Sequence, residues 1–421
     1  MSRIKIIPAG LNGKINIPSS KSISHRLIIA ASLSKGISNI ENISYSKDIL
    51  ATIDCLRNFG AEIEEKQHGL IIKGSSGVKF HGGNLNCSES GSTLRFLIPI
   101  ALTVDNSVNF HGQGKLIERP LNTYFKIFDE KNIKYRLENG RLPLHLEGKL
   151  ESGIYNVEGN VSSQFITGLL YSLPLLDGNS EINITSKLES KGYIDLTIDT
   201  LKKFGIDIEN KDYKKFIIEG NKTYRAGDFR VEGDFSQAAF FLAAGILGGT
   251  VSCQGLNIAS LQGDKEIINI IRKMGGDIKI EGNDIKASKS ETHGIIIDVS
   301  DFPDLVPIIA VIASVSLGRT EIINASRLRI KESDRLKAIS AELNKLGADV
   351  TELQDSLIIN GRKNLYGGSV ISYNDHRIAM ALSIAAIRCK NPVTIDGIEA
   401  VNKSYPGFWE DYKMIGGNLV E

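Results

Sequence analysis

Leu201-Lys-Lys-Phe-Gly205 is one of six similar stretches that decide the fold. Each stretch closes a helix-like pattern with a residue that tolerates the left-handed cap conformation, and a short strand pattern follows. The stretches recur at intervals of about 70 residues, which indicates an internal repeat. They are Leu56-Arg-Asn-Phe-Gly60, Asp129-Glu-Lys-Asn132, Leu201-Lys-Lys-Phe-Gly205, Ile271-Arg-Lys-Met-Gly275, Leu343-Asn-Lys-Leu-Gly347 and Tyr412-Lys-Met-Ile-Gly416. One structural unit, repeated six times, therefore accounts for the whole chain.

Each unit reads as βαβαββ when it is counted from the strand before its first helix. The two strands after a closing residue have a hairpin pattern, as at residues 62–64 and 70–73. The last copy supplies one strand after Gly416 and then stops. Residues 4–7 and 14–17 have the patterns of the missing hairpin strand and of a strand before a first helix. We therefore expect the two ends of the chain in one discontinuous domain.

The six units are expected to form two globular domains of three units each, because about 200 residues is a usual domain size. The expected domains are residues 1–19 plus 232–421, and residues 20–231, with the active site in the cleft between them. The fold class is α/β (α+β). A single closed ring of six units is the alternative that the pattern leaves open.

The composition excludes several classes of function. Of the 421 residues 42% are apolar, and 50 basic against 49 acidic residues leave a net charge of +1. No overall field favours nucleic acid or an anionic membrane, so neither is expected as a partner. The N-terminus lacks the apolar core of a signal peptide, and the longest apolar stretch, residues 238–247, ends in two glycines. We expect a monomer in the cytoplasm.

Neither a metal nor a cofactor is expected. The cysteines show no CxxC pair and suit a reduced, buried setting; they are Cys55, Cys87, Cys253 and Cys389. His25 and His376 have no second histidine or carboxylate at i+4 that would complete a metal site. Both histidines are expected to position neighbouring groups.

Cations open many of the expected helices, although the positive end of a helix dipole disfavours them. Free backbone NH groups at a helix start bind phosphates and carboxylates, and an added Lys or Arg strengthens such a site. The pattern therefore predicts an enzyme site for polyanionic small molecules. The cation-bearing starts are Lys21 to Arg26, Glu89 to Arg95, Arg119-Pro120, Ser190-Lys191, Lys265, Lys331 to Arg335, Asn374 to Arg377 and Lys403. Taken singly, five polar residues at helix starts read as ordinary N-caps: Ser20, Asp48, Ser162, Ser190 and Asp234.

The densest run of charge is Arg327-Leu-Arg-Ile-Lys-Glu-Ser-Asp-Arg335. A solvated ion-pair face is one interpretation of such a run. The alternative is catalytic, because Lys331, Glu332 and Arg335 are expected on adjoining faces of one first turn, where a carboxylate lies beside two anion ligands. Asp304, after a turn at Asp301-Phe-Pro303, is a second candidate base. An acid and a base near bound anions indicate proton-assisted group transfer.

At these residues the chain resembles the EPSP synthases, the 3-phosphoshikimate 1-carboxyvinyltransferases of the shikimate pathway, which leads to chorismate and the aromatic amino acids. Ten motifs occur in the family order between residue 8 and about residue 410. They are Pro18-Ser-Ser-Lys-Ser-Ile-Ser-His-Arg26, Glu89-Ser-Gly-Ser-Thr-Leu-Arg95, Glu118-Arg-Pro120, Val161-Ser-Ser-Gln164, Ser190-Lys-Gly-Tyr193, Gly233-Asp-Phe-Ser236, Pro303-Asp304, Leu328-Arg-Ile-Lys-Glu-Ser-Asp-Arg335, Asn374-Asp-His-Arg377 and Lys403-Ser-Tyr-Pro406. The resemblance implies two domains of three βαβαββ units joined by two crossovers, the inside-out α/β barrel of the enolpyruvyl transferases.

The resemblance also assigns substrates. Shikimate-3-phosphate is expected at Lys21, Ser22, Arg26, Ser162, Ser163, Gln164, Ser190, Asp304 and Lys331. Phosphoenolpyruvate is expected at Lys21, Gly91, Arg119, Gln164, Arg335, Arg377 and Lys403. In the family mechanism the substrate 5-hydroxyl adds to C2 of phosphoenolpyruvate while C3 is protonated, and the tetrahedral intermediate then loses phosphate. Asp304 is the expected hydroxyl base and Glu332 the expected proton donor and acceptor at C3, with Lys21 sharing that proton.

The chain departs from the family pattern around its second motif. Glu89 stands where much of the family has Asn, and Ser92 stands where the motif has Thr. Gly91, which lets the backbone approach phosphoenolpyruvate, is kept. These changes, with Phe96 after Arg95, put the sensitivity to glyphosate in doubt and leave the expected reaction unchanged.

Two other functions compete with this one. UDP-N-acetylglucosamine enolpyruvyl transferases share the fold and the donor and carry a catalytic cysteine in a loop; the corresponding residues 111–119 contain none, and Cys87 lies upstream in a strand pattern. A non-catalytic anion-binding relative would be expected to have lost Asp304, Glu332 or the paired arginines. All of these are present.

Overall fold

The computed structural model describes residues 2–79 and 82–420. The chain forms two compact units. Unit 1 contains the residues up to Pro18 and those from Glu232 onward, and unit 2 contains Ser19–Val231. Each unit carries three four-stranded sheets. None of the helices in the described part of the chain is both long and apolar enough to cross a membrane.

Unit 2 is built from alternating strands and helices in three repeats. Its elements are α1 (Lys21–Leu33), β3 (Lys35–Glu41), α2 (Lys47–Asn58), β4 (Glu62–Lys66), β5 (Gly69–Ser75), β6 (Gly83–Asn86), α3 (Gly91–Ala101), β7 (Asn106–His111), η1 (Gly114–Glu118), α4 (Asn122–Glu130), β8 (Lys134–Glu138), β9 (Arg141–Gly148), β10 (Ile154–Val157), α5 (Ser163–Ser172), η2 (Leu173–Leu175), β11 (Ser180–Ile184), α6 (Lys191–Lys203), β12 (Ile208–Lys211), β13 (Lys215–Ile218) and β14 (Asp228–Arg230).

Unit 1 repeats the same order and includes the N-terminal strands. Its elements are β1 (Arg3–Ile7), β2 (Asn12–Asn16), α7 (Phe235–Gly248), β15 (Thr250–Gln254), η3 (Gly263–Glu266), α8 (Ile267–Lys273), β16 (Asp277–Glu281), β17 (Asp284–Ser288), β18 (Ile296–Asp298), η4 (Pro303–Leu305), α9 (Val306–Ser314), β19 (Arg319–Ile323), η5 (Ser326–Ile330), α10 (Arg335–Lys345), β20 (Asp349–Glu352), β21 (Leu357–Asn360), β22 (Gly368–Ile371), α11 (His376–Ala385), η6 (Ala386–Arg388), β23 (Val393–Asp396), η7 (Ile398–Lys403), α12 (Phe408–Met414) and β24 (Asn418–Val420).

All six sheets have the same strand order. In the sheet β6-β7-β9-β8 the first two strands are parallel across the helix α3, and the last two form an antiparallel hairpin. The sheet β18-β19-β21-β20 of unit 1 is arranged in the same way. The βαβαββ repeat and the α/β fold class predicted from the sequence are confirmed.

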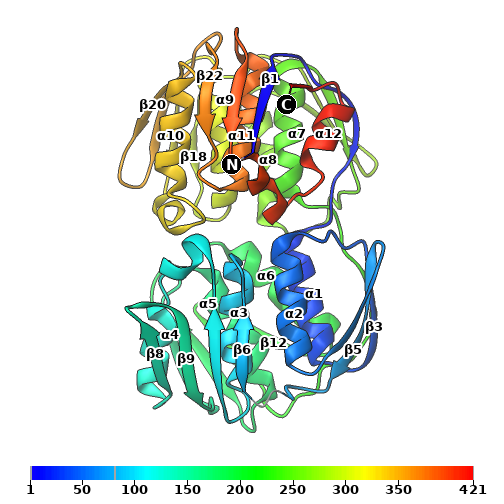
Figure 1. Ribbon diagram of the computed structural model, residues 1–421, viewed down its shortest axis with the longest axis vertical. Coiled ribbons are helices and arrows are strands. Elements are labelled where there is room, and N and C mark those ends of the chain that lie inside the picture. Colours follow the sequence, from blue (N-terminus) through cyan, green and yellow to red (C-terminus); the bar gives the residue numbers. More distant parts are fainter. Residues whose placement is uncertain (1, 80–81, 421) are drawn as a thin grey trace. The chain divides into compact units, whose positions relative to one another are not determined.

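The N-terminal strands complete two sheets of unit 1. Figure 1 shows β1 beside strands from the C-terminal part of the chain; it pairs antiparallel with both β23 and β24. Strand β2, although it comes just before α1 in the sequence, pairs in parallel with β15. Strand β14, which comes just before α7, pairs instead with β3 of unit 2. At each crossover, the last strand before the crossing therefore belongs to one unit and the helix that follows it belongs to the other.

The six closing residues adopt the backbone conformation that the sequence predicted. Their φ angles are 93° at Gly60, 55° at Asn132, 78° at Gly205, 88° at Gly275, 92° at Gly347 and 101° at Gly416. A side chain with a Cβ is strained in this region, so Gly is preferred there and Asn is the usual substitute. The helices of each unit end where these residues turn the chain into the next hairpin.

The first helix of each repeat is buried on nearly every side. Every residue of α9 and α11 is buried, as is all of α7 except its last residue. The second helices, such as α10, bury one face only. The first helices therefore lie inside each unit, and the sheets and second helices cover them. This arrangement places the starts of the inner helices of one unit close together.

Candidate active site

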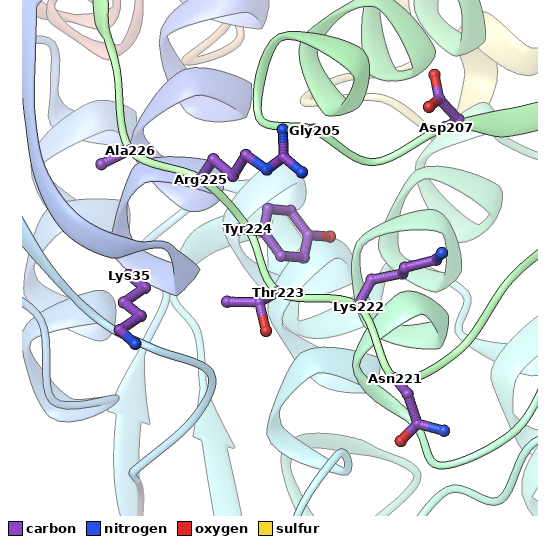
Figure 2. Close-up of a pocket in the computed structure, with 9 residues that line it drawn as sticks. All are labelled: Lys35, Gly205, Asp207, Asn221, Lys222, Thr223, Tyr224, Arg225 and Ala226. Carbon is purple, nitrogen blue, oxygen red and sulfur yellow. The ribbon is translucent and has the colours of Figure 1, made fainter.

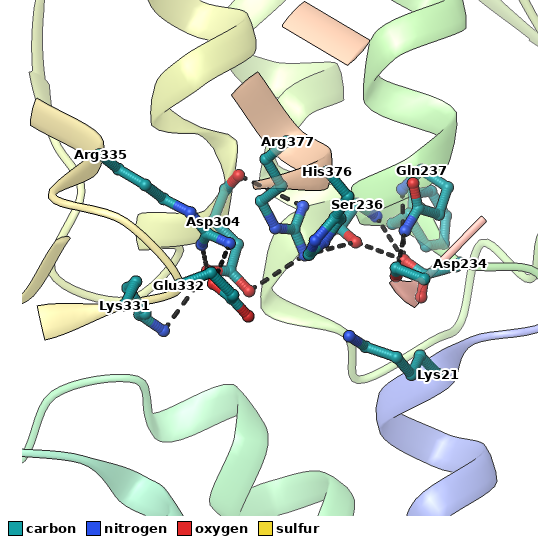
Figure 3. Close-up of polar contacts among 12 residues, drawn as sticks. Lys21, Asp234, Ser236, Gln237, Asp304, Lys331, Glu332, Arg335, His376 and Arg377 are labelled. Carbon is teal, nitrogen blue, oxygen red and sulfur yellow. Dashed lines mark hydrogen bonds and ion pairs between the residues drawn. The ribbon is translucent and has the colours of Figure 1, made fainter. Parts of the chain in front are cut away.

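In unit 1, side chains from the starts of three inner helices meet (Figure 3). Arg377, in the first turn of α11, donates from Nη2 to Ser236 Oγ of α7 at 3.1 Å and to Asp304 Oδ2 at 3.1 Å. Asp304 lies in the short helix η4 that leads into α9. Asp234, the N-cap of α7, accepts from Ser236 N at 2.8 Å and so fixes the turn that carries this serine. Each functional group is therefore held at a helix start.

Arg335 joins the carboxylates of this cluster. Its side chain is 1% exposed. Nη1 donates to Asp304 Oδ1 at 2.9 Å, Nε donates to Asp375 Oδ2 at 2.8 Å, and Nη2 forms a short contact with Glu332 Oε2. A buried guanidinium of this kind needs several charged acceptors, because an uncompensated buried charge is costly. The three carboxylates raise the pKa of Arg335 against the opposing effect of burial.

Asp375 is a member of the cluster that the sequence did not single out. It is fully buried and caps α11 by accepting from Arg377 N at 3.0 Å. Ser333 Oγ also donates to it at 2.9 Å. In the sequence it lies in the motif Asn374-Asp-His-Arg377 at an expected helix start, a position that an ordinary N-cap would equally occupy. Its second role, as the partner of Arg335, depends on a tertiary contact.

The cations around Asp304 set its charge. Burial by itself would raise the pKa of this carboxyl, but Arg377, Lys331 and Arg335 outweigh burial and hold the pKa well below its ordinary value. Lys331 Nζ lies 3.4 Å from Asp304 Oδ1. Burial lowers the pKa of Lys331, and Asp304 acts in the opposite direction. Asp304 is therefore an anion in the structure, with both oxygens bound by cations.

Three expectations about helix starts were wrong. Lys331 and Glu332 do not lie in the first turn of α10, because Asp334 caps that helix by accepting from Lys337 N at 3.1 Å and the helix begins at Arg335. Lys403 does not open a helix; it ends η7, and its Nζ donates to the carbonyl of Asn374 at 2.6 Å.

In unit 2, Lys21 opens α1 and forms an ion pair with Asp48 of α2, with Nζ and Oδ2 2.7 Å apart. Both side chains are mostly buried, at 17% and 12% exposed. From the sequence, Asp48 was expected to cap a helix. The residue before α2 is instead Ser46, and Asp48 lies in its first turn.

A second group of unit 2 surrounds the start of α3. A Cβ on Gly91 would lie 2.5 Å from Nη1 of Arg119, so a side chain at this position would displace the guanidinium. Gln164, in the first turn of α5, accepts from Arg95 Nη1 at 2.8 Å and donates to Ser92 Oγ at 3.0 Å. Gly91, Arg119 and Gln164, predicted together from the sequence, are thus neighbours. Arg119 precedes α4, which begins at Asn122.

Arg26 is held at the starts of two helices. Its guanidinium donates to the carbonyls of Ser22 and Tyr193, at 2.7 and 2.9 Å, and to Thr197 Oγ1 at 2.9 Å. It also lies over the ring of Phe96, 5.3 Å from the centroid. Phe96, one of the departures from the family pattern, therefore packs against a predicted substrate-binding residue.

The predicted N-caps divide into two groups. Ser162 and Asp234 accept from backbone NH groups at their helix starts. Ser20 and Ser190 precede α1 and α6 without a side-chain cap bond within the described residues. Ser190 has a φ of 57°, which is unusual for a serine. Ser20 and Ser190 were thus wrong as side-chain caps.

The remaining candidate ligands give no metal site. Within residues 2–79 and 82–420, no three His, Cys, Asp or Glu side chains are grouped for a metal ion. All four cysteines are free and buried. Burial raises the pKa of the Cys87 thiol well above its ordinary value, which argues against it as a nucleophile.

A polar groove of about 690 Å³ lies elsewhere in unit 2 (Figure 2). It adjoins Gly205, at the C-terminal end of α6, whereas the predicted site residue Ser190 lies at the other end of that helix. Arg225 donates its backbone NH to Phe204 O at 2.8 Å and lies against Gly205. A cation is favourable at a helix C-terminus, so a structural role accounts for this arginine.

The fold of six βαβαββ repeats and the cation-bearing helix starts define an enzyme of the enolpyruvyl transferase class. The family model of EPSP synthase (3-phosphoshikimate 1-carboxyvinyltransferase) matches residues 6–412. The chain belongs to this family. The predicted enzyme class, a transferase of the shikimate pathway that serves aromatic amino acid biosynthesis, is confirmed.

Individual relatives agree with the family match. The 3-phosphoshikimate 1-carboxyvinyltransferase of Clostridium novyi is 57% identical over 430 residues, covering 100% of this chain and 99% of the relative. The protein of the same name from Clostridioides difficile is 50% identical, with the same coverage. The EPSP synthase structure from Acinetobacter baumannii has a TM-score of 0.83 at 26% identity and covers 100% of both chains. An enolpyruvyl transferase from Streptomyces tendae, at 16% identity and a TM-score of 0.81, shares the fold.

Proposed function

We propose that this protein transfers the carboxyvinyl group of phosphoenolpyruvate to the 5-hydroxyl of shikimate-3-phosphate, through the residues gathered at the helix starts. The observation that carries the proposal is the cluster of unit 1, where Asp304 and Glu332 contact the same buried guanidinium of Arg335. Two carboxylates that share an anion-binding arginine can place an acid and a base beside one bound anion. No surface ion-pair face would bury such a group.

Phosphoenolpyruvate binds the cations of both units in this proposal. Arg335 and Arg377 present guanidinium groups suited to bidentate binding of its carboxylate. Gly91 lies against the guanidinium of Arg119 and carries no Cβ, so its backbone can approach phosphoenolpyruvate beside this cation. The full set is Lys21, Gly91, Arg119, Gln164, Arg335, Arg377 and Lys403.

Shikimate-3-phosphate binds at the starts of α1, α5 and α6. Backbone NH groups and hydroxyls at these starts are suited to its phosphate, and Arg26 is suited to its ring carboxylate. Ser162, Ser163, Ser190 and Lys331 hold the phosphate in this assignment. The complete set is Lys21, Ser22, Arg26, Ser162, Ser163, Gln164, Ser190, Asp304 and Lys331.

The reaction proceeds by addition and elimination. Asp304 accepts the proton of the 5-hydroxyl as the hydroxyl oxygen bonds to C2 of phosphoenolpyruvate. Glu332 gives a proton to C3, and Lys21 shares that proton. The phosphate then leaves C2, and Glu332 takes the proton back from C3 as the double bond re-forms. A general acid or base contributes about 10² to 10⁴ in rate, so these two carboxylates supply a substantial part of the acceleration.

Phosphoenolpyruvate itself prepares Asp304 for this role. The cations that hold the pKa of Asp304 well below its ordinary value include Arg377 and Arg335, the proposed ligands of the substrate carboxylate. A bound carboxylate competes with Asp304 for these two guanidinium groups. Its arrival weakens their hold on Asp304, which raises the pKa of Asp304 and makes it a better base.

The residue assignments require residues of both units to act on the same substrates. Closure on the substrates would then exclude water from the tetrahedral intermediate. We also propose that the protein acts as a monomer, and its net charge of +1 favours neither nucleic acid nor a membrane as partner. The four free, buried cysteines support the cytoplasm as its location.

The release of phosphate tests the proposal. The protein is mixed with phosphoenolpyruvate and either shikimate-3-phosphate or UDP-N-acetylglucosamine, and free phosphate is measured with time. We expect release with shikimate-3-phosphate only. Release with the nucleotide sugar alone would overturn the substrate assignment, and release with neither acceptor would favour a non-catalytic anion-binding protein.

A further inference from the structure

A buried chain of hydrogen bonds connects three helices of unit 2. His25 Nδ1 of α1 lies 2.8 Å from Thr52 Oγ1 of α2. This hydroxyl lies 2.6 Å from Thr93 Oγ1 of α3, and Thr93 in turn bonds to Ser90 Oγ at 2.7 Å. All four side chains are at most 1% exposed. Thr52 and Thr93 are 41 positions apart in the sequence. This series of hydrogen bonds is therefore a tertiary feature and not a helix cap alone.

The direction of the protons follows from Ser90. This residue caps α3, and its Oγ accepts from Thr93 N at 3.2 Å as well as from the Thr93 hydroxyl. With the Thr93 proton directed to Ser90, Thr52 gives its proton to Thr93. In this assignment, which directs the Thr52 proton to Thr93 at 2.6 Å and not to the carbonyl oxygen of Asp48 at 3.3 Å, His25 donates from Nδ1 to Thr52. One tautomer of His25 therefore completes the whole chain.

The imidazole is neutral. Burial, followed by the positive charges of Lys21 and Arg26, lowers the pKa of His25 well below its ordinary value. A neutral ring adds no further positive charge beside these cations and keeps one nitrogen as donor and the other as acceptor. The neutral ring can therefore keep the Nδ1 donor role that this series of hydrogen bonds requires.

Each member of the chain lies next to a group of the proposed site. His25 is one helical turn after Lys21, and Thr52 is one turn after its ion-pair partner Asp48. The Thr52 hydroxyl also lies 3.3 Å from the carbonyl oxygen of Asp48. Ser90 immediately precedes Gly91, against which Arg119 packs. The hydrogen bonds therefore connect the helix turns that carry Lys21 and Gly91.

We propose that His25, Thr52 and Thr93 are positioning residues that fix the starts of α1, α2 and α3 relative to one another for phosphoenolpyruvate binding. This inference rests on the proposed assignment of Gly91 and Arg119 to phosphoenolpyruvate alone and of Lys21 to both substrates. Arg26, assigned to the other substrate, follows His25 but is independently held by Thr197 and Tyr193 of α6. Loss of these hydrogen bonds should therefore raise the KM for phosphoenolpyruvate more than the KM for shikimate-3-phosphate.

Thr52→Val tests the proposal, because valine keeps the shape of the side chain and removes the hydroxyl. It leaves the buried Nδ1 of His25 without its acceptor. We expect the KM for phosphoenolpyruvate to rise about 3- to 30-fold, the scale of one lost buried hydrogen bond, and the KM for shikimate-3-phosphate to change less than about twofold. Thr52→Ser restores a hydroxyl and should bring the KM for phosphoenolpyruvate to within about threefold of the unsubstituted protein.

Two controls separate the possible failures. Thr93→Val with Thr93→Ser repeats the test at the next link, in case Thr52→Val does not fold, and thermal unfolding reports stability for each variant. Equal rises in both KM values, no rise in either, or a serine variant as weak as the valine variant would overturn the positioning role. Arg119→Ala tests the underlying assignment separately: an unchanged KM for phosphoenolpyruvate in this variant would refute the assigned site itself.

Discussion

Asp304 lies within ion-pair distance of three cations, Arg335, Arg377 and Lys331, and two of these are assigned to phosphoenolpyruvate. One residue therefore has two properties in the structure: it neutralises the cations before substrate binds, and it is the proposed base afterwards. A carboxylate that only balanced charge would affect binding, whereas a base affects turnover. The two contributions can be measured separately.

Asp304→Asn should lower kcat by about 10² to 10⁴, the range for a lost general base. The KM for phosphoenolpyruvate should stay the same or fall, because Arg335 and Arg377 no longer share their charge with a carboxylate. Steady-state kinetics with each substrate varied in turn provide the measurement. A large rise in this KM with kcat little changed would show that Asp304 organises the arginines and is not the base.

The pH dependence of stability gives a second test at Asp304. Its pKa in the folded protein lies below the value of about 3.9 in an unfolded chain, so the stabilisation by its carboxylate is complete above that value. The stabilisation is lost as the pH falls toward the folded pKa. Urea titrations give the free energy of unfolding of the unsubstituted protein and of Asp304→Asn at each pH. The difference between these two free energies should be the same at about pH 7 and 5.5 and smaller at about pH 3. A difference that grows on acidification would contradict the low pKa.

At the scale of the element, the helix closures carry the repeat. Gly205 has a φ of 78°, and a Cβ there would lie 3.0 Å from Cδ of Arg225. Asn132 adopts a φ of 55° at the equivalent position of another repeat. The conformation is common to both closures although the residues differ. Substitutions at Asn132 can therefore separate the effect of the backbone from that of the side chain.

Asn132→Ala should lower the free energy of unfolding by about 1 kcal/mol, because alanine is disfavoured in the left-handed region. Asn132→Gly should change it by less than about 0.5 kcal/mol, since glycine accepts this φ and the residue is exposed. Gly205→Ala should be at least as destabilising as Asn132→Ala. Equal stability of the alanine and glycine variants at 132 would show that the closure does not require the left-handed conformation.

Local sequence patterns predicted the helices, strands and closing residues better than they predicted side-chain contacts between separate elements. The closing residues, the hairpins and the helix starts carrying Lys21 and Arg377 could be read from the sequence, because caps and periodicity are local properties. The partners Asp48 and Asp375 could not, since each pairs with a cation on another helix. The start of α10 was predicted too early, because the charged residues before the helix are as closely spaced as those at its beginning. Lys331 still lies near Asp304, but through a tertiary contact and not through a turn of α10.

At the scale of the whole molecule, the crossovers exchange two strands. Strand β2 precedes α1 but completes a sheet of unit 1, and β14 precedes α7 but completes a sheet of unit 2. The sequence predicted the first of these placements from the truncated last repeat. It carried no comparable sign of the pairing of β14 with β3. The exchange makes unit 2 continuous in sequence and unit 1 discontinuous.

Residues 19–231 expressed alone should fold cooperatively, because every strand of their three sheets lies within that segment. Residues 232–421 alone lack β1 and β2 and should not fold. Joining residues 2–18 to the C-terminal segment after Glu421 or before Glu232 by a flexible linker should restore a cooperative transition. Urea unfolding followed by circular dichroism is the measurement. Cooperative unfolding of the segment 232–421 without the N-terminal strands would contradict the proposed dependence on β1 and β2.

The central claim for the molecule is that residues at its helix starts and in the segment before α10 bring an acid and a base to one transfer reaction. The most direct measurement is kcat for Glu332→Gln at saturating phosphoenolpyruvate and shikimate-3-phosphate, with Glu352→Gln, which breaks an ion pair to Arg329 outside the cluster, as the matched control. We predict a loss of about 10² to 10⁴ in kcat for Glu332→Gln with both substrates still bound, and a kcat within about twofold for Glu352→Gln. A high residual kcat with collapsed substrate binding in Glu332→Gln would contradict the account.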